Sequence, residues 1–253
     1  MKIMAISDIH GRMDLLPDLE NSIQREDPAV IVFTGDIVKG HARGNEFLSA
    51  LKEGRKPDPN IEAIVKETTE DEKFYNEFLE FLDEINIPTF CIPGNMDAPE
   101  GRYYREFWEP SFKSENVHVI HGSPAYFGGY IFCGWGGQLV EKGKEDFFVL
   151  MYPEHDVSVN LLSLRHFDLP VILLFHSPPV GDLGLEKEEQ KGTHVVNRLV
   201  SAINPEYFFC GHAHKAQGAQ KIGNSLGLNP GALKNGNYMM LDTENRSFKS
   251  STL

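Results

Sequence analysis

Residues 2–10 read KIMAISDIH, an apolar run of strand length that leads into an aspartate and a histidine two positions apart. Four further apolar runs, AVIVF, PTFCI, PVILL and EYFFC, also lead directly into polar residues. Short apolar runs rich in β-branched and aromatic residues are typical of buried strands. Because parallel strands end along one edge of a sheet, the polar residues that follow them can converge on one point. The sequence therefore predicts one polar site at the edge of a mostly parallel sheet.

The residues after these runs are of the types that bind metal ions. They comprise two aspartates, one asparagine and four histidines, with no cysteine among them. Oxygen and nitrogen donors of this kind suit a pair of divalent transition metals better than a structural zinc site. We expect two ions, with Mn²⁺ favoured and with Fe, Ni²⁺, Co²⁺ and Zn²⁺ also compatible with these donors. The predicted metal ligands are Asp8, His10, Asp36, Asn95, His176, His212 and His214.

The spacing within the motifs predicts how the ligands are shared. Asp8 and His10 are two residues apart, so on an extended strand both side chains point to one face and can reach one ion. Asp36 follows a glycine, which allows close approach of the backbone, and its carboxylate can bridge two ions with one oxygen on each. His212 and His214 have the same spacing as the first pair, but on a loop they can diverge and serve different ions.

The motifs DIH, GD, GNMD, H and GHAH follow one another over residues 8–214, and this pattern resembles the calcineurin-like metallophosphoesterase family. The likeness extends to NPGALKNGNYMMLD at residues 229–242, so it covers nearly the whole chain. It implies hydrolysis of a phosphate ester by in-line attack of a hydroxide held by two metal ions. It also implies one ion held by Asp8, His10, Asp36 and His214, and a second held by Asp36, Asn95, His176 and His212.

One position departs from the family pattern. Many members have a histidine where this chain has Met96, and a thioether cannot transfer a proton. We therefore expect phosphodiesters and activated monoesters to be hydrolysed in preference to alkyl monoesters. The predicted catalytic residues are Asp36, Asn95 and Asp97, with Asp97 orienting a histidine or the turn at Asn95 rather than acting as the acid. His41 is interpreted as a solvated loop residue rather than as a substitute acid.

The order of the segments predicts the fold. Strand-like and helix-like segments alternate through the first half, shorter strands follow from residue 117, and turn residues after position 214 indicate antiparallel strands. This order predicts an α/β fold, a four-layer αββα sandwich of two mixed β-sheets flanked by helices. We expect a single domain over residues 1–253, with a helical cap at about 40–73. Residues 177–192 are interpreted as a solvated connection rather than a mobile lid.

Composition and net charge restrict the kinds of molecule that the chain is expected to bind. The chain has 253 residues, a formal net charge of −13 and a pI near 5.2, which argues against binding to nucleic acid or an anionic membrane. No apolar stretch approaches membrane-spanning length, and no signal peptide is visible. Three widely spaced cysteines in apolar runs indicate buried thiols in a reducing compartment, so we expect a cytoplasmic protein. The expected partner is a small phosphate-ester substrate, and apolar residues on the cap helices could pair two copies of the chain.

Two other functions agree with part of this pattern. A non-catalytic metal-binding scaffold would keep the same fold, but all seven ligand positions are filled here, which favours an enzyme. A nuclease-type phosphodiesterase would need a basic stripe that this acidic sequence does not show. Arg12, Lys39 and Arg43 are candidates for binding substrate phosphate, although isolated charges near loops are usually solvated. The aromatic run YYREFWEPSF at residues 103–112 and Trp135 are interpreted as packing residues.

Overall fold

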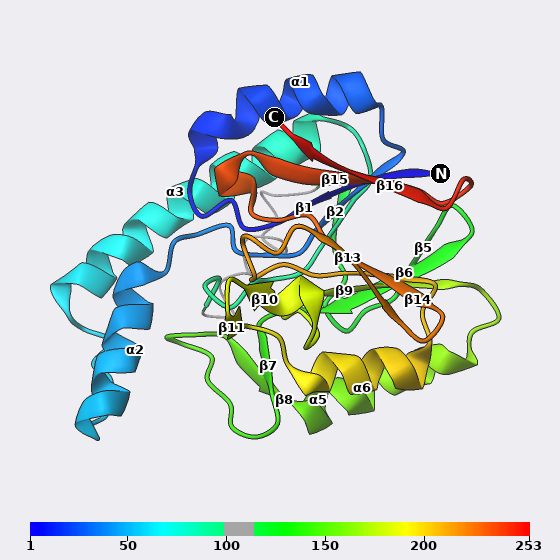
Figure 1. Cartoon of the computed structure of the whole chain (residues 1–253). Coiled ribbons are helices and arrows are strands. Elements are labelled where there is room, and N and C mark those ends of the chain that lie inside the picture. Colours follow the sequence, from blue (N-terminus) through cyan, green and yellow to red (C-terminus); the bar gives the residue numbers. More distant parts are fainter. Residues whose placement is uncertain (99–113) are drawn as a thin grey trace.

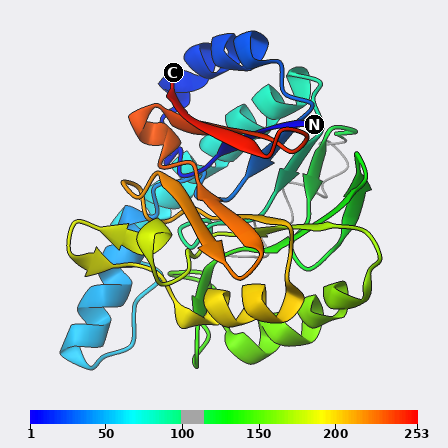
Figure 2. The same ribbon diagram turned by 45° about the vertical axis from the view of Figure 1, so that its right-hand side comes forward.

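The fold consists of two six-stranded sheets packed face to face, with helices on the outer faces (Figures 1 and 2). It is seen in a computed structural model that describes residues 1–98 and 114–253. Both large sheets contain parallel and antiparallel neighbours, so the predicted αββα sandwich of two mixed sheets is confirmed. The aromatic run at residues 103–112 lies outside the described residues.

The first sheet has a parallel half and an antiparallel edge. In spatial order its strands are β16 (Ser247–Thr252), β15 (Asn237–Asp242), β1 (Lys2–Ile6), β2 (Val30–Phe33), β3 (Thr89–Cys91) and β4 (Val117–Val119). Strands β1 to β4 are parallel, whereas β15 is antiparallel to both of its neighbours. Along β1, Ile3 and Ala5 belong to the core between the sheets, and Met4 and Ile6 pack under the helices. Burial of both faces explains why KIMAI is continuously apolar.

The second sheet has a parallel centre with an antiparallel strand at each edge. In spatial order its strands are β13 (Gly218–Ile222), β14 (Ser225–Asn229), β12 (Tyr207–Phe209), β9 (Val171–Phe175), β6 (Tyr130–Trp135) and β5 (Ala125–Phe127). The antiparallel pairing expected for the tail is confirmed for β13 with β14 and for β15 with β16. Strand β14 also runs parallel to β12, which the turn residues of the tail did not indicate.

Helices cover both sheets. The helices are α1 (Leu16–Glu26), α2 (His41–Glu53), α3 (Glu62–Glu84), α5 (Glu154–Leu161) and α6 (His194–Ile203), and the 3-10 turns are η1 (Met13–Leu15), η2 (Leu162–His166), η3 (Asp182–Gly184) and η4 (Leu233–Asn235). In α1, Leu16, Leu19 and Ile23 recur at helical spacing and pack with residues of the first sheet and of α3. Helices α5 and α6 pack on the second sheet. Together, these helices complete the outer layers of the sandwich.

Three smaller parts lie outside the two large sheets and the helices that cover them. Helix α2 and the start of α3 project from the body at the left of Figure 1. Residues 177–192 contain η3 and a short hairpin of β10 (Leu185–Glu186) with β11 (Glu189–Gln190), so the interpretation as a plain solvated connection is wrong in part. A further pair, β7 (Gln138–Val140) and β8 (Met151–Pro153), is parallel. Among the helices of the described residues, none is long and apolar enough to cross a membrane.

Candidate metal centre

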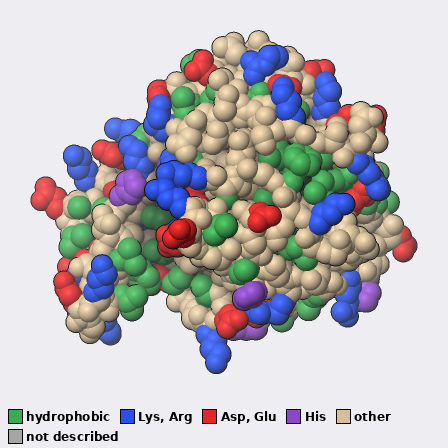
Figure 3. All heavy atoms as spheres, viewed as in Figure 1, with side chains coloured by type: hydrophobic (Ala, Val, Ile, Leu, Met, Phe, Trp, Pro, Cys, Tyr) green, Lys and Arg blue, Asp and Glu red, His purple; other side chains and the backbone are tan. Residues whose placement is uncertain are grey.

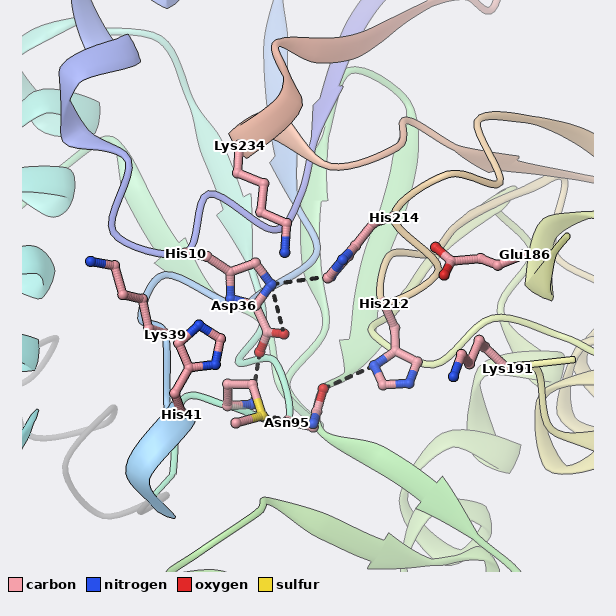
Figure 4. Close-up of a pocket in the computed structure, with 11 residues that line it drawn as sticks. His10, Asp36, Lys39, His41, Asn95, Glu186, Lys191, His212, His214 and Lys234 are labelled. Carbon is pink, nitrogen blue, oxygen red and sulfur yellow. Dashed lines mark hydrogen bonds and ion pairs between the residues drawn. The ribbon is translucent and has the colours of Figure 1, made fainter. Parts of the chain in front are cut away.

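All seven predicted ligands lie on turns that follow strands, and both large sheets contribute. Strands β1, β2 and β3 of the first sheet end before Asp8 and His10, before Asp36 and before Asn95, respectively. Strands β9 and β12 of the second sheet end before His176 and before His212 and His214. The parallel strands of the two sheets end on the same side of the molecule, and Figure 4 shows five of the side chains that meet there, those of His10, Asp36, Asn95, His212 and His214. The convergence expected from the sequence is therefore present.

Four of the ligands have a left-handed backbone. The φ angle is 56° at Asp8, 46° at His10, 65° at Asp36 and 65° at His212. This conformation is uncommon for residues other than glycine, and strained residues of this kind cluster at functional sites. The prediction that an extended strand aligns Asp8 with His10 is therefore wrong, since β1 ends at Ile6. A strained turn, rather than the pleat of a strand, brings the two side chains together.

Two glycines let the turns after β2 and β3 touch. A Cβ atom on Gly35 would lie 2.3 Å from the backbone nitrogen of Gly94. A Cβ atom on Gly94 would lie 2.1 Å from Oδ1 of Asp36. Both distances are far below van der Waals contact, so only a residue without a Cβ fits at either position. The glycines of the GD and GNMD motifs therefore set the distance between Asp36 and Asn95.

The first ligand cluster consists of Asp8, His10 and His214, whose ligand atoms all lie within 4.8 Å of one another. Nε2 of His10 and Nε2 of His214 are 3.1 Å apart, and Oδ1 of Asp8 is 3.3 Å from the latter atom. Nδ1 of His10 lies 2.9 Å from the carbonyl oxygen of Val38 and donates its proton there. The lone pair of Nε2 therefore faces the cluster, as in histidines that bind metals.

The second cluster forms around the side-chain oxygen of Asn95. Oδ1 of Asn95 lies 2.8 Å from Nε2 of His176 and 2.9 Å from Nδ1 of His212. Nδ1 of His176 is 2.8 Å from the carbonyl oxygen of Thr34 and donates there, so its Nε2 faces the cluster, as in histidines that bind metals. His212 and His214 therefore diverge, with His214 in the first cluster and His212 in the second.

Asp36 lies between the two clusters. Its Oδ2 atom is 3.6 Å from Nε2 of His10 and 3.4 Å from Nε2 of His176, whereas its Oδ1 accepts a hydrogen bond of 2.8 Å from the backbone of Met96. The sequence predicted one oxygen of this carboxylate for each ion, and that sharing stays a prediction. A single oxygen faces both clusters, and the second oxygen fixes the orientation of the carboxylate. Asp8 also lies within 4.8 Å of Asp36 and His176, so both aspartates are central.

The electrostatics of the site call for bound cations. Oδ1 of Asp8 is buried 3.3 Å from Nε2 of His214 and has no donor in hydrogen-bond geometry among the described residues. Burial lowers the pKa of His176, but the carboxylates of Asp36 and Asp8 and a hydrogen bond to Asp36 raise it to about 9. Burial alone would raise the pKa of Asp8, yet the nearby imidazoles of His214, His176 and His10 hold it well below its usual range. Divalent ions would supply this charge, so the donors fit metal binding.

Asp97 holds the two metal-binding turns together from beneath the pocket. Its Oδ2 accepts hydrogen bonds from the backbone of Asp36 (2.8 Å) and Gly94 (2.7 Å). Its Oδ1 accepts from Ile37 at 2.9 Å and from the Tyr75 hydroxyl at 3.1 Å. Burial and the charge of Asp36 raise the pKa of Asp97 to about 6, although these backbone donors oppose the shift. Its contacts are with the turns rather than with a histidine.

A cavity of about 330 Å³ opens beside the centre. It is lined by His10, Asp36, Lys39, His41, Asn95, Met96, Glu186, Lys191, His212, His214 and Lys234. His41 is the first residue of α2 rather than a loop residue, and it faces this cavity (Figure 4). The sequence singled out neither Lys234 nor the hairpin residues Glu186 and Lys191. These side chains lie outside the ligand motifs, so only the fold reveals that they border the site.

Arg43 and Arg12 do not have the role that we considered for them. Arg43 is buried rather than solvated: its guanidinium donates to Asp71 at 2.5 Å and to the backbone carbonyl of Met96 at 2.6 Å. It therefore connects α2 to the GNMD turn and is not available to a substrate. Arg12 is exposed and pairs with Asp14 at 2.7 Å. Of the three basic residues considered as phosphate ligands, Lys39 alone lines the cavity.

Comparison with known proteins agrees with this geometry. Residues 1–253 match the family described as metallophosphoesterase, calcineurin superfamily, and the chain belongs to this family. An uncharacterised protein of Methanocaldococcus jannaschii is 23% identical over 256 residues, which span 96% of this chain and 93% of that protein. One crystal structure, 30% identical, superposes on 99% of this chain and 98% of its own with a TM-score of 0.89. A crystal structure of a Thermus thermophilus protein is 24% identical, with 99% and 98% coverage and a TM-score of 0.76.

Proposed function

We propose that the chain is a dinuclear metal-dependent phosphoesterase that prefers phosphodiesters and activated monoesters to alkyl monoesters. One observation carries the dinuclear part: Oδ2 of Asp36 lies within 3.6 Å of a histidine of each ligand cluster. A carboxylate shared in this way is the usual bridge of a two-metal site. Membership of the metallophosphoesterase family supports the hydrolase chemistry.

The chain's own residues bind and orient the two ions and the substrate. When bound, divalent ions would activate the attacking water and neutralise charge on the phosphate oxygens. The proposed ligands of one ion are Asp8, His10, Asp36 and His214, and those of the other are Asp36, Asn95, His176 and His212. We propose Mn²⁺, because carboxylate, amide and imidazole donors together suit it. Asp97 is proposed as a positioning residue, since its hydrogen bonds fix the turns that present Asp36 and Asn95.

Met96 supports the preference for good leaving groups. Its sulfur accepts a hydrogen bond of 3.1 Å from Nδ2 of Asn95, and it lines the cavity next to the clusters. A thioether carries no proton to give, so this position cannot stabilise a departing alkoxide. Esters whose leaving group departs without a proton are therefore favoured.

The test combines metal analysis with a substrate series. Chelator-treated protein is reloaded with Mn²⁺, and bound metal is measured together with turnover of bis(p-nitrophenyl) phosphate, p-nitrophenyl phosphate and a simple alkyl phosphate. We expect two ions per chain and turnover in that order. Fewer than one ion per chain would favour a non-catalytic scaffold, and equal or faster hydrolysis of the alkyl ester would contradict the preference.

The three cysteines indicate the cellular compartment of the protein. We propose a reducing compartment such as the cytoplasm, because Cys91, Cys133 and Cys210 are buried free thiols and burial raises the pKa of Cys133 to about 12.

We also propose that α2 and the start of α3 act as a cap on a single domain, and that they pair two copies of the chain. Leu51 and Val65 on these helices are 68% and 57% exposed, which supports such a contact. A mass of one chain by light scattering would exclude the dimer.

A further inference from the structure

Cations gather at the pocket beside the metal centre, although the chain as a whole has a net charge of −13. Three lysines line the pocket, namely Lys39, Lys191 and Lys234. Lys191 is paired with Glu189 at 2.5 Å, whereas neither of the other two has an ion pair with a carboxylate of the described residues. Figure 3 shows basic side chains gathered where the α2–α3 projection meets the body. Two lysines are thus available to an anionic ligand.

These two lysines lie at different places relative to the centre. Lys234 extends from η4 with its amino group directed at the metal centre, and its backbone nitrogen bonds to the carbonyl of Asp8 at 3.1 Å (Figure 4). Lys39 extends away from Asp36, on the far side of His41 in that view. Its amino group lies 5.3 Å from the centre of the Phe74 ring. A phosphate at the centre would meet the first lysine, and only a group further out would meet the second.

A second cavity continues outward from this point. It has a volume of about 410 Å³, lies between α2 and α3, and shares Lys39 and His41 with the first cavity. Two of its three carboxylates are held by other groups: Glu67 accepts hydrogen bonds from the backbone at the start of α2, and Asp71 pairs with Arg43. The third, Glu70, is exposed, and Lys66 lines the same cavity. These contacts limit the repulsion that an anion beside Lys39 would meet from this wall.

We propose that Lys39 and His41 form a second anion subsite, and that the substrates are phosphate esters that carry a further phosphate group near the scissile one. This inference rests on the proposed phosphoesterase function, because it places the scissile phosphate at the metal centre below Lys234. Hydrogen bonds from an ammonium group to phosphate oxygens are stronger than those between neutral groups. The partly buried position of Lys39 also reduces screening by salt.

The experiment measures binding of two ligands that differ by one phosphate. Thymidine 5′-phosphate and thymidine 3′,5′-bisphosphate are titrated calorimetrically into the full chain loaded with Mn²⁺. We expect the bisphosphate to bind on the order of tenfold more tightly. Lys39→Met should remove most of that ratio, whereas Lys234→Met should weaken both ligands by a similar factor. Lys221→Met, which changes an exposed lysine of β13, is the matched control and should leave both affinities unchanged.

A hydrolysis assay distinguishes an incorrect subsite from an incorrect phosphoesterase function. The 5′-(p-nitrophenyl) ester of thymidine 5′-phosphate is compared with the same ester that carries a 3′-phosphate, so that the leaving group is identical. A lower KM for the second ester, lost in Lys39→Met, supports the subsite. Equal KM values for two hydrolysed esters, or a binding ratio unchanged by Lys39→Met, would overturn it. If neither ester is hydrolysed but the binding ratio responds to Lys39→Met, the subsite stands and the phosphoesterase function fails.

Discussion

The metal centre and the rim of its pocket are built in opposite ways. The ligands of the centre lie on short turns directly after buried strands, and most of them are buried. The rim is built from α2, from the β10–β11 hairpin and from η4, and its side chains are mostly exposed or partly buried. A core that packs densely allows its turns few alternatives, whereas exposed segments tolerate change. The centre therefore sets the chemistry that the chain can perform, and the rim sets which molecule it acts on.

The sharpest test of the centre is to replace its shared carboxylate. Asp36→Asn keeps the size of the side chain, and asparagine also tolerates the left-handed backbone found there. Loss of the negative charge between the clusters should cost at least one bound ion and lower turnover of bis(p-nitrophenyl) phosphate by about 10³-fold. Metal content and kcat are measured together. Glu80→Gln on the exposed face of α3 is the control, and two tightly bound ions in Asp36→Asn would contradict a bridging role.

The contact between rim and centre can be broken at Arg43. Arg43→Met removes the guanidinium that pairs with the buried carboxylate of Asp71, which should lower the free energy of unfolding by ~3–5 kcal/mol. Asp71→Leu combined with Arg43→Met removes both charges and should recover part of the loss. Urea denaturation measures the wild-type chain and both variants. If the single and double variants are equally stable, the ion pair does not hold α2 against the GNMD turn.

Asp97 tests whether the centre depends on residues that do not touch the ions. Asp97→Asn replaces one acceptor oxygen by a donor beside backbone N–H groups, so the turns at Asp36 and Gly94 lose fixed hydrogen bonds. Metal affinity should fall by about 10–100-fold. Tyr75→Phe removes one donor to the same carboxylate and should have a smaller effect. Competition with a chelator of known affinity gives both values, and unchanged affinity in Asp97→Asn would show that the turns hold their shape alone.

The variant Met96→His tests whether position 96 alone determines the proposed preference for leaving groups that depart without a proton. The variant should speed hydrolysis of alkyl phosphates by about tenfold or more, with little gain for p-nitrophenyl esters, because a nitrophenolate departs without a proton. Met96→Gln, which is similar in length but supplies no acid, is the matched control. Equal gains for all leaving groups would mean that the histidine acts through binding rather than through proton transfer.

A further test concerns the stability of the fold in acid, next to Trp135. Burial lowers the pKa of His121, which packs against Trp135 with ring centres 4.4 Å apart, to about 3. In the unfolded chain the His121 imidazole is protonated below about pH 6.5, whereas in the folded chain it is protonated only below about pH 3. Stability should be fully present above this window and fall as the pH drops through it. His121→Gln should flatten this slope in denaturation curves between about pH 4 and pH 7, and an unchanged slope would assign it to other groups.

The same contrast explains how far the sequence alone could lead. The αββα sandwich and the site of convergence follow from local signals, because each ligand motif comes directly after an apolar run such as KIMAI. The single oxygen of Asp36 that faces both clusters could not be foreseen, and neither could the contact between the turns after β2 and β3. Both depend on backbone angles and on contacts between segments far apart in the chain. His41 and Arg43 differ by two positions, yet one faces the pocket and the other is buried. Only the packing of α2 against α3 decides between these outcomes.

The pairing of β1 with β15 has a consequence for biosynthesis. Asp8 emerges early from the ribosome, but its backbone carbonyl is bound by Lys234 and its carboxylate accepts from the backbone of His212. Neither cluster can be complete until the segment around residue 214 has been synthesised and lies against the turn after β1. A nascent chain therefore exposes ligands without a finished site to hold an ion. If the chain binds the proposed ions, stable uptake would follow synthesis of the segment around residue 214, and a chain truncated before it would lack both complete clusters.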